Sequence, residues 1–578
     1  MKHSKRYIVL AVLLLIVFLF KFQVMRVDAG RIDQFRGGTL DKDSWYPLVA
    51  EDVNGKLLTL VIDNKEYTNE KYLFYMDHNR NIMVPVDILR DAMNCSAHLY
   101  DGSHLLVEKH NYYAQITLNE QTAISSGDAV LLGSNLVEFG GNYYVSLTDL
   151  AKMLGYSFSF DVTTNTIVAA DMAENINSLP AKYDLRDRYR VPTVRDQGKL
   201  GTCWAFGAVS ALESSLLPED SYVFSADHMS LSNSFATGQN DGGEYTMSMA
   251  YLAAWQGPVY EVDDPYGDGE SNNKLTAVKH VQEMRIIASK DIAAIKEAVF
   301  KYGGVQTSLY SSLKNASSSS KYYNKETHSY CYIGTNKPNH DVVIVGWDDN
   351  YPKENFNTSL EGDGAFICQN SWGTSFGENG VFYVSYYDSN IGTHNLAYTR
   401  VEDKDNYDNI YQSDLCGWVG KLGYEKESMY GANVFTAKSN EEVVAAGFYA
   451  TAPDTEYKVY VVSDFTGVNS FRNRQLVAEG VLEDAGYYTV DFENGVSVKE
   501  GKKYAVVVYV KTPGSTHPMA IEYNTGDKKL ANVDLEDGEG YISYSGNTFI
   551  NVKDKQDCNL CIKAFTNGKK NTKVGYSE

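Results

Sequence analysis

The sequence predicts a multidomain α+β protein: a small α+β repeat module, then a central unit with helical and strand segments, then a C-terminal β-sandwich. Three observations support this prediction. The chain has 578 residues, far more than one domain contains, and 43% of them are hydrophobic, which is enough for several cores. A pattern near the N-terminus is repeated, and the last part of the chain alternates as strands do. We expect folded units at residues 30–172, 179–400 and 401–566.

Charge and cysteine content limit the function classes. The formal net charge of -22 would repel phosphates, so a nucleic-acid partner is not expected, and it suits a soluble surface or secreted protein. Seven cysteines are too few for a disulfide framework, and the odd number leaves one thiol free. Cys558 and Cys561 form a CxxC pair without a second pair nearby, which favours buried thiols or one local bridge over zinc. We expect no metal and no cofactor.

The N-terminus, residues 1–29, is predicted to be an export segment. A basic cluster within the first six residues precedes an apolar run from Ile8 to Phe20, and Val27-Asp28-Ala29 offers a small-residue cleavage site. Apolar residues beyond Lys21 extend the run, so an uncleaved membrane anchor is the alternative. Either reading places the rest of the chain outside the cell, secreted or anchored at the bacterial cell surface.

Residues 30–172 contain two copies of one pattern. VPVDILRDAM from Val84 resembles VSLTDLAKML from Val145, 61 residues later, and each copy continues into a candidate hairpin. The expected unit is a short helix followed by paired strands, with turns at Asp101-Gly102 and at 163–165. This region resembles the copper amine oxidase N-terminal-like module of bacterial exported proteins. Copper is not expected, because no histidine cluster has ligand spacing. A spacer, a wall-attachment element and an unorthodox inhibitor remain open, in that order.

Cys203 begins a helical pattern in the central unit. The stretch CWAFGAVSALESSLL places apolar residues at helical spacing, which predicts a buried helix with Cys203 on its first turn. The partial positive charge of a helix N-terminus favours a thiolate, so we expect a lowered pKa for this thiol. An isolated cysteine is more often a packing residue, and the reactive interpretation therefore depends on its partners.

Three further residues complete a catalytic pattern. His340 lies 137 residues after Cys203 and begins an apolar run that predicts a buried strand. Asn370 follows 30 residues later, and its amide can accept from one imidazole nitrogen so that the other faces sulfur. Gln197, six residues before Cys203, offers a donor that would stabilise the oxyanion together with the Cys203 N–H. The three side-chain types at 203, 340 and 370 match a Cys-His-Asn apparatus.

The segment 179–400 resembles the papain family of cysteine peptidases. The resemblance is carried by LPAKYDLRD, DQG, GTCWAF, a glycine pair, NHDVVIVGW and NSWGTSFGENG. It implies an endopeptidase with a papain-like two-lobe fold: a left helical lobe carrying Cys203 and a right β-rich lobe carrying His340 and Asn370. It also implies that Trp372 shields the contact between His340 and Asn370 from water. The substrate-binding residues that it suggests are Gly242, Gly243, Asn339 and Trp372.

The chain departs from the family pattern in three places. Leu200 and Asn240-Asp241 stand where many relatives carry cysteines, so the usual left-lobe disulfide cannot form and packing must stabilise the lobe. Glu244 and its neighbours follow the glycine pair where apolar groups are common, which leaves the side-chain preference open. Residues 348–364 lengthen the connection from histidine to asparagine and are expected to form a polar loop.

Residues 401–566 show alternating strand patterns separated by turn residues, which predicts a β-sandwich. This region resembles the lectin-like domain that follows papain-type domains in bacterial and archaeal proteins, and it suggests docking to a glycan or a protein surface. No binding residue is assigned, because most of the 44 tyrosines are expected to be strand formers. Residues 567–578 are expected to be a flexible tail.

The predicted function is that of a secreted or cell-surface cysteine endopeptidase that hydrolyses proteins or peptides through an acyl-enzyme. Two alternatives remain. One is an inactive peptidase scaffold that acts as a surface binding protein, and the other is a Cys-His acyl-transfer enzyme that acts on cell-wall peptides. The physiological substrate, the activation event and any glycan ligand are not predicted.

Overall fold

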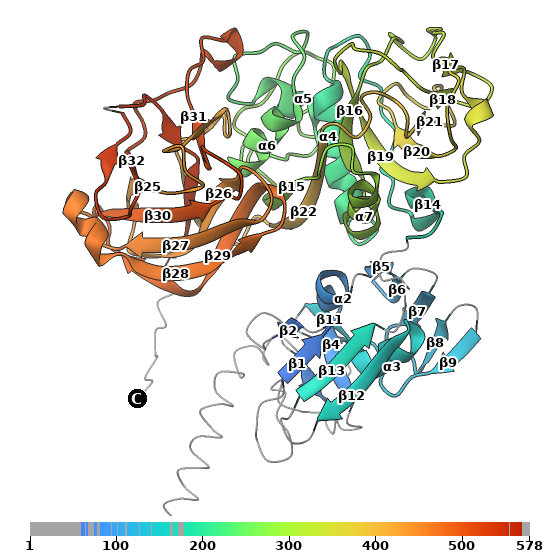
Figure 1. The fold of residues 1–578 in the computed structure, drawn as a ribbon, viewed down its shortest axis with the longest axis horizontal. Coiled ribbons are helices and arrows are strands. Elements are labelled where there is room, and N and C mark those ends of the chain that lie inside the picture. Colours follow the sequence, from blue (N-terminus) through green and yellow to red (C-terminus); the bar gives the residue numbers. More distant parts are fainter. Residues whose placement is uncertain are drawn as a thin grey trace, which may run out of the picture. The chain divides into compact units, whose positions relative to one another are not determined.

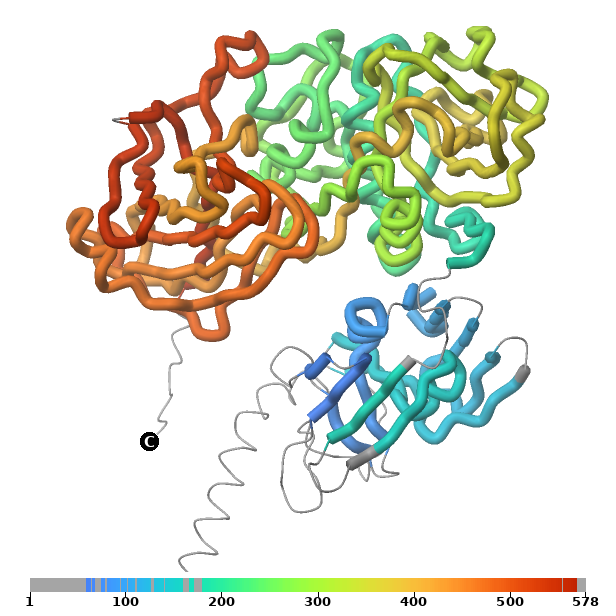
Figure 2. Tube along the Cα trace, in the orientation of Figure 1, coloured from blue at the N-terminus to red at the C-terminus, as the bar shows by residue number. Residues whose placement is uncertain are grey.

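A computed structural model describes residues 59–171, with gaps at 64, 68–73, 78–80, 94, 101, 110–111, 126–127, 140 and 162–165, and residues 179–568 except 554. The chain divides into two compact units, Met1–Pro180 and Ala181–Glu578, which Figure 2 colours from blue to red along the sequence. The predicted export segment at 1–29 and residues 569–578 of the predicted tail lie outside the described residues. Among the described helices, none is long and apolar enough to span a bilayer.

The first unit is built from short strands and two short helices among its described residues. Its elements are β1 (Thr59–Ile62), β2 (Lys65–Tyr67), β3 (Tyr75–Met76), β4 (Ile82–Pro85), α2 (Asp87–Ala92), β5 (Ser96–Tyr100), β6 (His104–Lys109), β7 (Tyr112–Thr117), β8 (Thr122–Ser125), β9 (Asp128–Leu131), β10 (Val137–Phe139), β11 (Asn142–Ser146), α3 (Leu147–Met153), β12 (Tyr156–Asp161) and β13 (Thr166–Asp171). They form three sheets, with the strand orders β12-β13-β1-β2, β10-β11-β4-β3 and β5-β6-β7-β8-β9.

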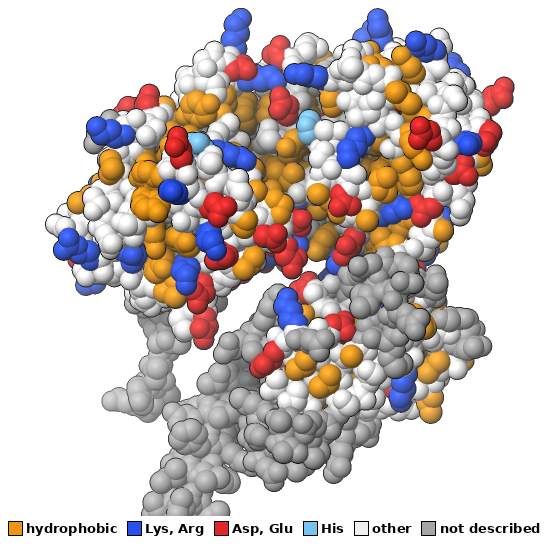
Figure 3. Space-filling model, viewed as in Figure 1, with side chains coloured by type: hydrophobic (Ala, Val, Ile, Leu, Met, Phe, Trp, Pro, Cys, Tyr) orange, Lys and Arg blue, Asp and Glu red, His pale blue; other side chains and the backbone are white. Residues whose placement is uncertain are grey.

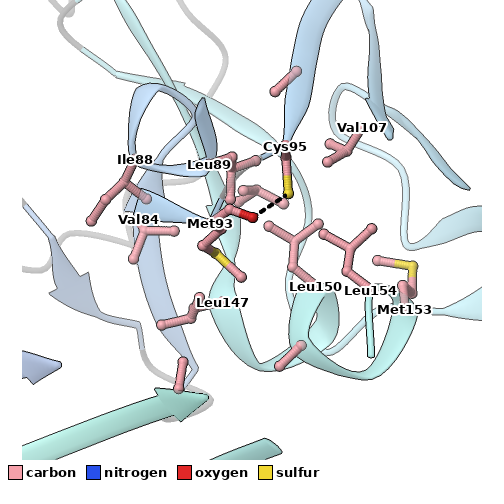
Figure 4. Close-up of a cluster of buried hydrophobic side chains, with 14 of the residues drawn as sticks. Val84, Ile88, Leu89, Met93, Cys95, Val107, Leu147, Leu150, Met153 and Leu154 are labelled. Carbon is pink, nitrogen blue, oxygen red and sulfur yellow. Dashed lines mark hydrogen bonds between the residues drawn. The ribbon is translucent and has the colours of Figure 1, made fainter. Parts of the chain in front are cut away.

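The predicted repeat is confirmed in this unit. Helix α2 precedes the antiparallel pair β5 and β6, and α3 precedes the antiparallel pair β12 and β13. Leu89 and Leu150, which occupy equivalent positions in the two copies, are both fully buried in one core (Figure 4). The first expected turn includes Gly102, which has a φ of +69°, whereas residues 163–165 of the second lie outside the described residues.

The second unit begins with two lobes that face each other across helix α4, as Figure 1 shows. One lobe is helical and the other is β-rich, so the predicted two-lobe architecture is confirmed. The elements are β14 (Lys182–Asp184), η3 (Leu185–Arg188), α4 (Cys203–Leu216), α5 (Ala226–Leu231), α6 (Tyr245–Ala253), β15 (Lys279–Ile286), α7 (Ile292–Tyr302), β16 (Val305–Leu309), β17 (Tyr323–Asn324), β18 (Ser329–Tyr330), β19 (His340–Asp348), η4 (Lys353–Asn355), β20 (Ala365–Gln369), β21 (Val381–Ser385) and β22 (Asn395–Asp403).

The helical lobe holds together without a disulfide. The six cysteines of the second unit are free thiols, and Cys558 and Cys561 are buried, which decides between the two readings of the CxxC pair. In place of a cross-link near Leu200, the Gly201 N–H donates to the Gln239 carbonyl over 2.8 Å. The Gln239 amide then donates to Asp227 Oδ1 over 2.7 Å, which ties this segment to α5.

The segment 348–364 is not simply a polar loop. It contains the short helix η4, and it buries Tyr351 and Phe356 against Cys331 and Ala365. The Tyr351 ring also stacks on Tyr383 of β21, with ring centroids 4.4 Å apart. The prediction of a polar loop is thus incomplete, because these two aromatic side chains form a small core of their own.

The C-terminal part is a β-sandwich, as predicted. Its elements are β23 (Asn409–Tyr411), β24 (Gly420–Leu422), β25 (Ser428–Thr436), β26 (Glu441–Ala450), β27 (Thr455–Val462), η5 (Val468–Asn473), β28 (Gln475–Leu482), β29 (Ala485–Val498), β30 (Lys503–Lys511), β31 (Met519–Glu522), η6 (Lys528–Leu530), β32 (Gly540–Ser543), β33 (Ile550–Asn551), β34 (Asn559–Leu560) and β35 (Ile562–Gly568). Phe448 and Tyr488 of one sheet share a buried core with Val459 and Val506 of the other. On the face shown in Figure 3, acidic and basic side chains are interspersed with hydrophobic patches.

One sheet of 13 strands joins the two-lobe part to the sandwich. Its order is β17-β18-β21-β20-β19-β16-β22-β15-β29-β26-β35-β23, with β14 beside β19. At the junction, Arg285 of β15 lies opposite Gly486 of β29. Gly486 has a φ of +152°, and a Cβ atom there would lie 2.1 Å from the Met284 carbonyl oxygen, so only glycine allows this approach. The sandwich is thus hydrogen-bonded to the two-lobe part along strand edges.

Candidate active site

Cys203 is the first residue of α4, the central helix of the second unit. The helix is buried from Trp204 to Ser214, and Figure 1 shows it between α5 and α6 on one side and β16 and β19 on the other. Cys203 itself is partly exposed. The thiol therefore stands at the end of a rigid element.

His340 and Asn370 meet at the ends of two neighbouring strands. His340 begins β19, Asn370 directly follows β20, and these strands pair antiparallel. His340 Nε2 lies 2.8 Å from Asn370 Oδ1. Because Oδ1 only accepts, Nε2 carries the proton and Nδ1 has its lone pair. The Asn370 backbone N–H donates to the Gly380 carbonyl over 2.9 Å, which fixes this residue in place.

Trp372 covers the histidine. Its indole stacks on the His340 ring with centroids 4.8 Å apart and planes 27° apart, and only 6% of the residue is exposed. An indole in this position keeps water from the hydrogen bond between His340 and Asn370. This geometry matches the shielding that the family resemblance implies, whereas nothing here assigns Trp372 to substrate binding.

Gln197 is buried beside the β-rich lobe and is held by several contacts. Its backbone N–H donates to the Ser371 carbonyl over 2.9 Å, and its Oε1 accepts from Ser371 Oγ over 2.7 Å. Its Nε2 donates to the Leu200 carbonyl over 2.8 Å. An amide nitrogen carries two protons, and this bond uses one of them.

The predicted lowering of the Cys203 pKa is not what the structure gives. Burial, reinforced by the nearby Asp341 carboxylate, raises the pKa of this thiol to about 12, although the N–H groups of Asp341, Trp204 and Cys203 act in the opposite direction. Burial likewise lowers the pKa of His340 to about 4, against the hydrogen bond to Asn370. Burial thus favours the neutral thiol and the neutral imidazole. The helix prediction failed because it considered the local backbone and not the desolvation of the site.

Asp341 is a site residue that the sequence reasoning missed. It is buried, and its carboxylate accepts from Gln306 Nε2 over 2.9 Å and from Ser308 Oγ over 2.7 Å. Gln306 Nε2 also donates to the Trp204 carbonyl over 3.1 Å, which links the carboxylate to the helix of Cys203. The only signal in the sequence was its position directly after His340.

The residues predicted to bind substrate lie close to these groups. A Cβ atom at Gly243 would lie 2.4 Å from the Trp204 indole, so glycine is required at this position beside the residue that follows Cys203. Gly242 has a φ of +72°. Asn339, which precedes His340, accepts from the Ser311 N–H over 2.7 Å and donates to the Ser311 carbonyl over 3.1 Å. Its amide is thus engaged in holding a neighbouring segment.

No cofactor-like group of ligands accompanies these residues. In the part of the chain that the structure describes, no three His, Cys, Asp or Glu side chains are placed so that they could hold a metal ion. The chemistry available at the site is that of a thiol, an imidazole, amide donors and a buried carboxylate.

Family models match all three predicted units. Residues 61–169 match the copper amine oxidase N-terminal domain, residues 179–401 the papain family cysteine protease, and residues 410–566 the lectin like domain. The three predicted resemblances are confirmed.

Two solved structures of one clostridial protein are similar over two of these units. The cysteine protease Cwp84 after propeptide cleavage is 27% identical, with a TM-score of 0.60 over 67% of this chain and 99% of that chain. The protease and lectin-like domains of Cwp84, a surface layer associated protein of Clostridium difficile, give 26% identity and a TM-score of 0.59 over 67% of this chain and 89% of that chain.

Curated relatives are similar over a shorter part. Cysteine proteinase 1 of Zea mays is 31% identical over 224 residues, which are 36% of this chain and 57% of the maize protein. Cathepsin K of Mus musculus is 26% identical over 277 residues, 46% of this chain and 79% of the mouse protein. The chain thus spans little more than half the length of the maize relative.

Proposed function

Residues 179–401 of this chain are a papain-family cysteine protease domain, and we propose that the chain is a cysteine endopeptidase that acts through Cys203, His340 and Asn370. The observation that carries the proposal is the hydrogen bond of 2.8 Å between His340 Nε2 and Asn370 Oδ1, which leaves Nδ1 as a base. Gln197, at the loop before Cys203, is proposed as an oxyanion donor.

The proposed reaction has two halves. His340 Nδ1 takes the proton of the Cys203 thiol as sulfur attacks the peptide carbonyl, and the carbonyl oxygen becomes an oxyanion that accepts from the Cys203 N–H and the Gln197 amide. His340 then gives its proton to the leaving amine, and an acyl-enzyme remains. Water attacks the acyl carbon, His340 takes a proton from it, and the sulfur leaves as the thiol regains that proton.

The charges of the resting groups support this order of events. A thiol whose pKa is raised to about 12 and an imidazole whose pKa is lowered to about 4 are both neutral near pH 7. Burial opposes a charge on either group before substrate binds, so we propose that proton transfer accompanies the attack on the carbonyl. Asn370 favours the productive tautomer throughout, because its Oδ1 accepts from Nε2 both in the neutral ring and in the imidazolium.

The chain from Leu179 onward, labelled with an epoxysuccinyl thiol-protease inhibitor and assayed with peptide substrates, tests the proposal. We expect covalent mass on Cys203 and peptide turnover, with both lost in Cys203→Ser and kept in Cys416→Ser, whose thiol is buried and hydrogen-bonded to the Ser234 carbonyl. Labelling without peptide cleavage would favour the acyl-transfer enzyme. A folded sample that shows neither would favour the inactive scaffold.

We further propose that the C-terminal domain binds carbohydrate at the cell surface. Its match to the lectin like domain supports this, and so does a hollow of about 420 Å³ between β25 and the segment that follows β30. Tyr544 lines the hollow and is 54% exposed, and an exposed ring can stack on the apolar face of a sugar. The other lining residues are Glu425, Lys426, Glu427, Ser428, Lys511, Gly514, Ser515 and Thr516.

Binding to purified bacterial cell-wall polysaccharide measures this role. Tyr544→Ala is expected to weaken binding, and Tyr387→Ala, which removes an exposed tyrosine (42%) from the protease domain, is expected to leave it unchanged. Equal binding by both variants would exclude the hollow as the glycan site.

Export of the chain is the last part of the proposal. It is supported by the basic cluster and apolar run within residues 1–29, and by the surface-layer association named for the similar clostridial protease. N-terminal sequencing of the exported protein distinguishes the two forms: a start at Gly30 indicates a cleaved signal, and a start at Met1 indicates an anchor. A protein found only inside the cell would contradict export.

A further inference from the structure

The N-cap of the catalytic helix has an unusual partner. Thr202 precedes α4, and a threonine in this position ordinarily accepts with its side chain from an N–H of the first turn. Here the Thr202 side chain makes no such bond. Its Oγ1 lies instead 2.6 Å from the hydroxyl of Tyr266, a residue of the loop between α6 and β15. Thr202 is fully buried, so this is a fixed contact.

The Tyr266 hydroxyl has a second partner. It donates to the Gln197 carbonyl over 2.8 Å. A phenol has only one proton, and the Gln197 carbonyl accepts it. The Tyr266 oxygen therefore accepts from the Thr202 hydroxyl, whose proton points at Tyr266. One hydroxyl therefore connects the backbone of Gln197 with the residue that precedes Cys203.

This connection leaves the start of α4 open. The Ala205 and Phe206 N–H groups donate to the Thr202 carbonyl, and the Cys203 N–H is the backbone donor proposed for the oxyanion. If the Thr202 hydroxyl turned back onto the helix, it would compete for these first N–H groups. The Tyr266 hydroxyl keeps it away and keeps the Gln197 backbone at a fixed place beside them.

The Tyr266 ring is held independently of its hydroxyl. It packs edge-on against Phe206 with ring centroids 4.7 Å apart, and its backbone N–H donates to Glu261 Oε1 over 3.0 Å. Removing the hydroxyl alone therefore leaves the ring in place and breaks only the connection between Gln197 and Thr202.

We infer that Tyr266 is a positioning residue of the oxyanion hole, which acts by holding the Gln197 loop and the N-terminus of α4 in register. The inference rests on the proposed peptidase function. It assigns Tyr266 to the stabilisation of the oxyanion and not to the reactivity of the thiol, and the two effects can be measured separately.

The test compares wild type and Tyr266→Phe in the full chain with three probes. Hydrolysis of a peptide amide and binding of a peptide aldehyde both place a negative oxygen in the oxyanion hole, whereas alkylation by iodoacetamide does not. We expect kcat to fall about ten-fold or more with KM nearly unchanged, and aldehyde affinity to fall with it. The rate of iodoacetamide alkylation of Cys203 is expected to stay the same.

Two controls separate positioning from general destabilisation. Tyr251→Phe removes a hydroxyl of the same lobe, which lies 2.6 Å from His228 Nδ1. This variant is expected to lose about as much thermal stability as Tyr266→Phe does, but to keep its kcat. Gln197→Ala combined with Tyr266→Phe is expected to cost less than the product of the single effects, because both act on one donor.

An unchanged kcat in Tyr266→Phe would overturn the inference, and so would a parallel fall in alkylation and hydrolysis. A wild-type chain that is folded but neither cleaves peptides nor is alkylated at Cys203 would instead overturn the proposed function itself.

Discussion

His340 Nε2 and Asn370 Oδ1 lie 2.8 Å apart because β19 and β20 pair antiparallel and place the first residue of one strand beside the residue that follows the other. The sheet thus sets the orientation of the imidazole, and Trp372 stacks on it from the outside. The base of the proposed reaction is positioned by strand pairing, and the nucleophile by a helix.

Asn370→Ala removes the acceptor that fixes the tautomer of His340. We expect kcat for peptide hydrolysis to fall between about ten- and a hundred-fold, because the ring then also samples the tautomer in which Nδ1 carries the proton. Steady-state kinetics measures this change, with the exposed Asn350→Ala as the control. A variant with unchanged kcat would show that Trp372 packing alone orients the ring.

Asp341→Asn removes the carboxylate beside the thiol and keeps its size. Burial is the main cause of the raised pKa of Cys203 and the Asp341 charge is the second, so the variant is expected to have a lower thiol pKa. The pH profile of iodoacetamide alkylation is then expected to move toward lower pH. At a pH below the thiol pKa, each unit by which that pKa falls raises the thiolate fraction about ten-fold. Asp348→Asn, at the far end of β19, should leave the profile in place; an identical shift in both variants would contradict the assignment.

Gly486→Ala tests the strand junction between the protease part and the sandwich. The new Cβ would meet the Met284 carbonyl oxygen at 2.1 Å and force β29 away from β15. We expect a loss of about 1–3 kcal/mol in the free energy of unfolding. Gly467 also has a positive φ, of +144°, but a Cβ atom there would meet no atom within 4 Å. Gly467→Ala therefore measures the cost of the positive φ alone. Equal losses in a thermal melt would mean that the close approach contributes nothing.

Glu522→Gln tests a buried carboxyl of the sandwich. Burial raises the pKa of Glu522 from 4.5 to about 7, and Asp414 adds to this, so the folded chain binds its proton more tightly than the unfolded chain does. The stabilisation from this proton is complete below about pH 4.5 and is lost as pH rises through 7. The free energy of unfolding of wild type relative to Glu522→Gln should therefore fall between these two pH values. Glu536→Gln, at an exposed position (91%), should give a flat difference; a wild-type advantage that grows with pH would reverse the sign and contradict the burial argument.

Much of the site follows from local patterns. The helix at Cys203 and the strand at His340 are visible as apolar periodicity, and Gly243 marks a close approach that only glycine permits. The helix–hairpin repeat of the first unit is visible for the same reason, since each copy buries one hydrophobic face.

The remaining features depend on contacts that are distant in the sequence. The pairing of β15 with β29 joins segments about 200 residues apart. An alternating pattern predicts a strand, but it does not predict which distant strand pairs with it. Tyr266 lies 69 residues from Gln197, so its hydroxyl bond has no local signature. The direction in which the Cys203 pKa shifts could not be predicted either, because the desolvation that raises it arises only in the folded site.

We propose that peptide bonds are cleaved through an acyl-enzyme on Cys203. Rapid-quench mass spectrometry of the chain mixed with an activated ester of a short peptide tests it most directly. We predict an acyl adduct on the Cys203 peptide that forms before free acid appears and then decays at the rate of turnover. Turnover without any adduct, or an adduct on another residue, would contradict the account.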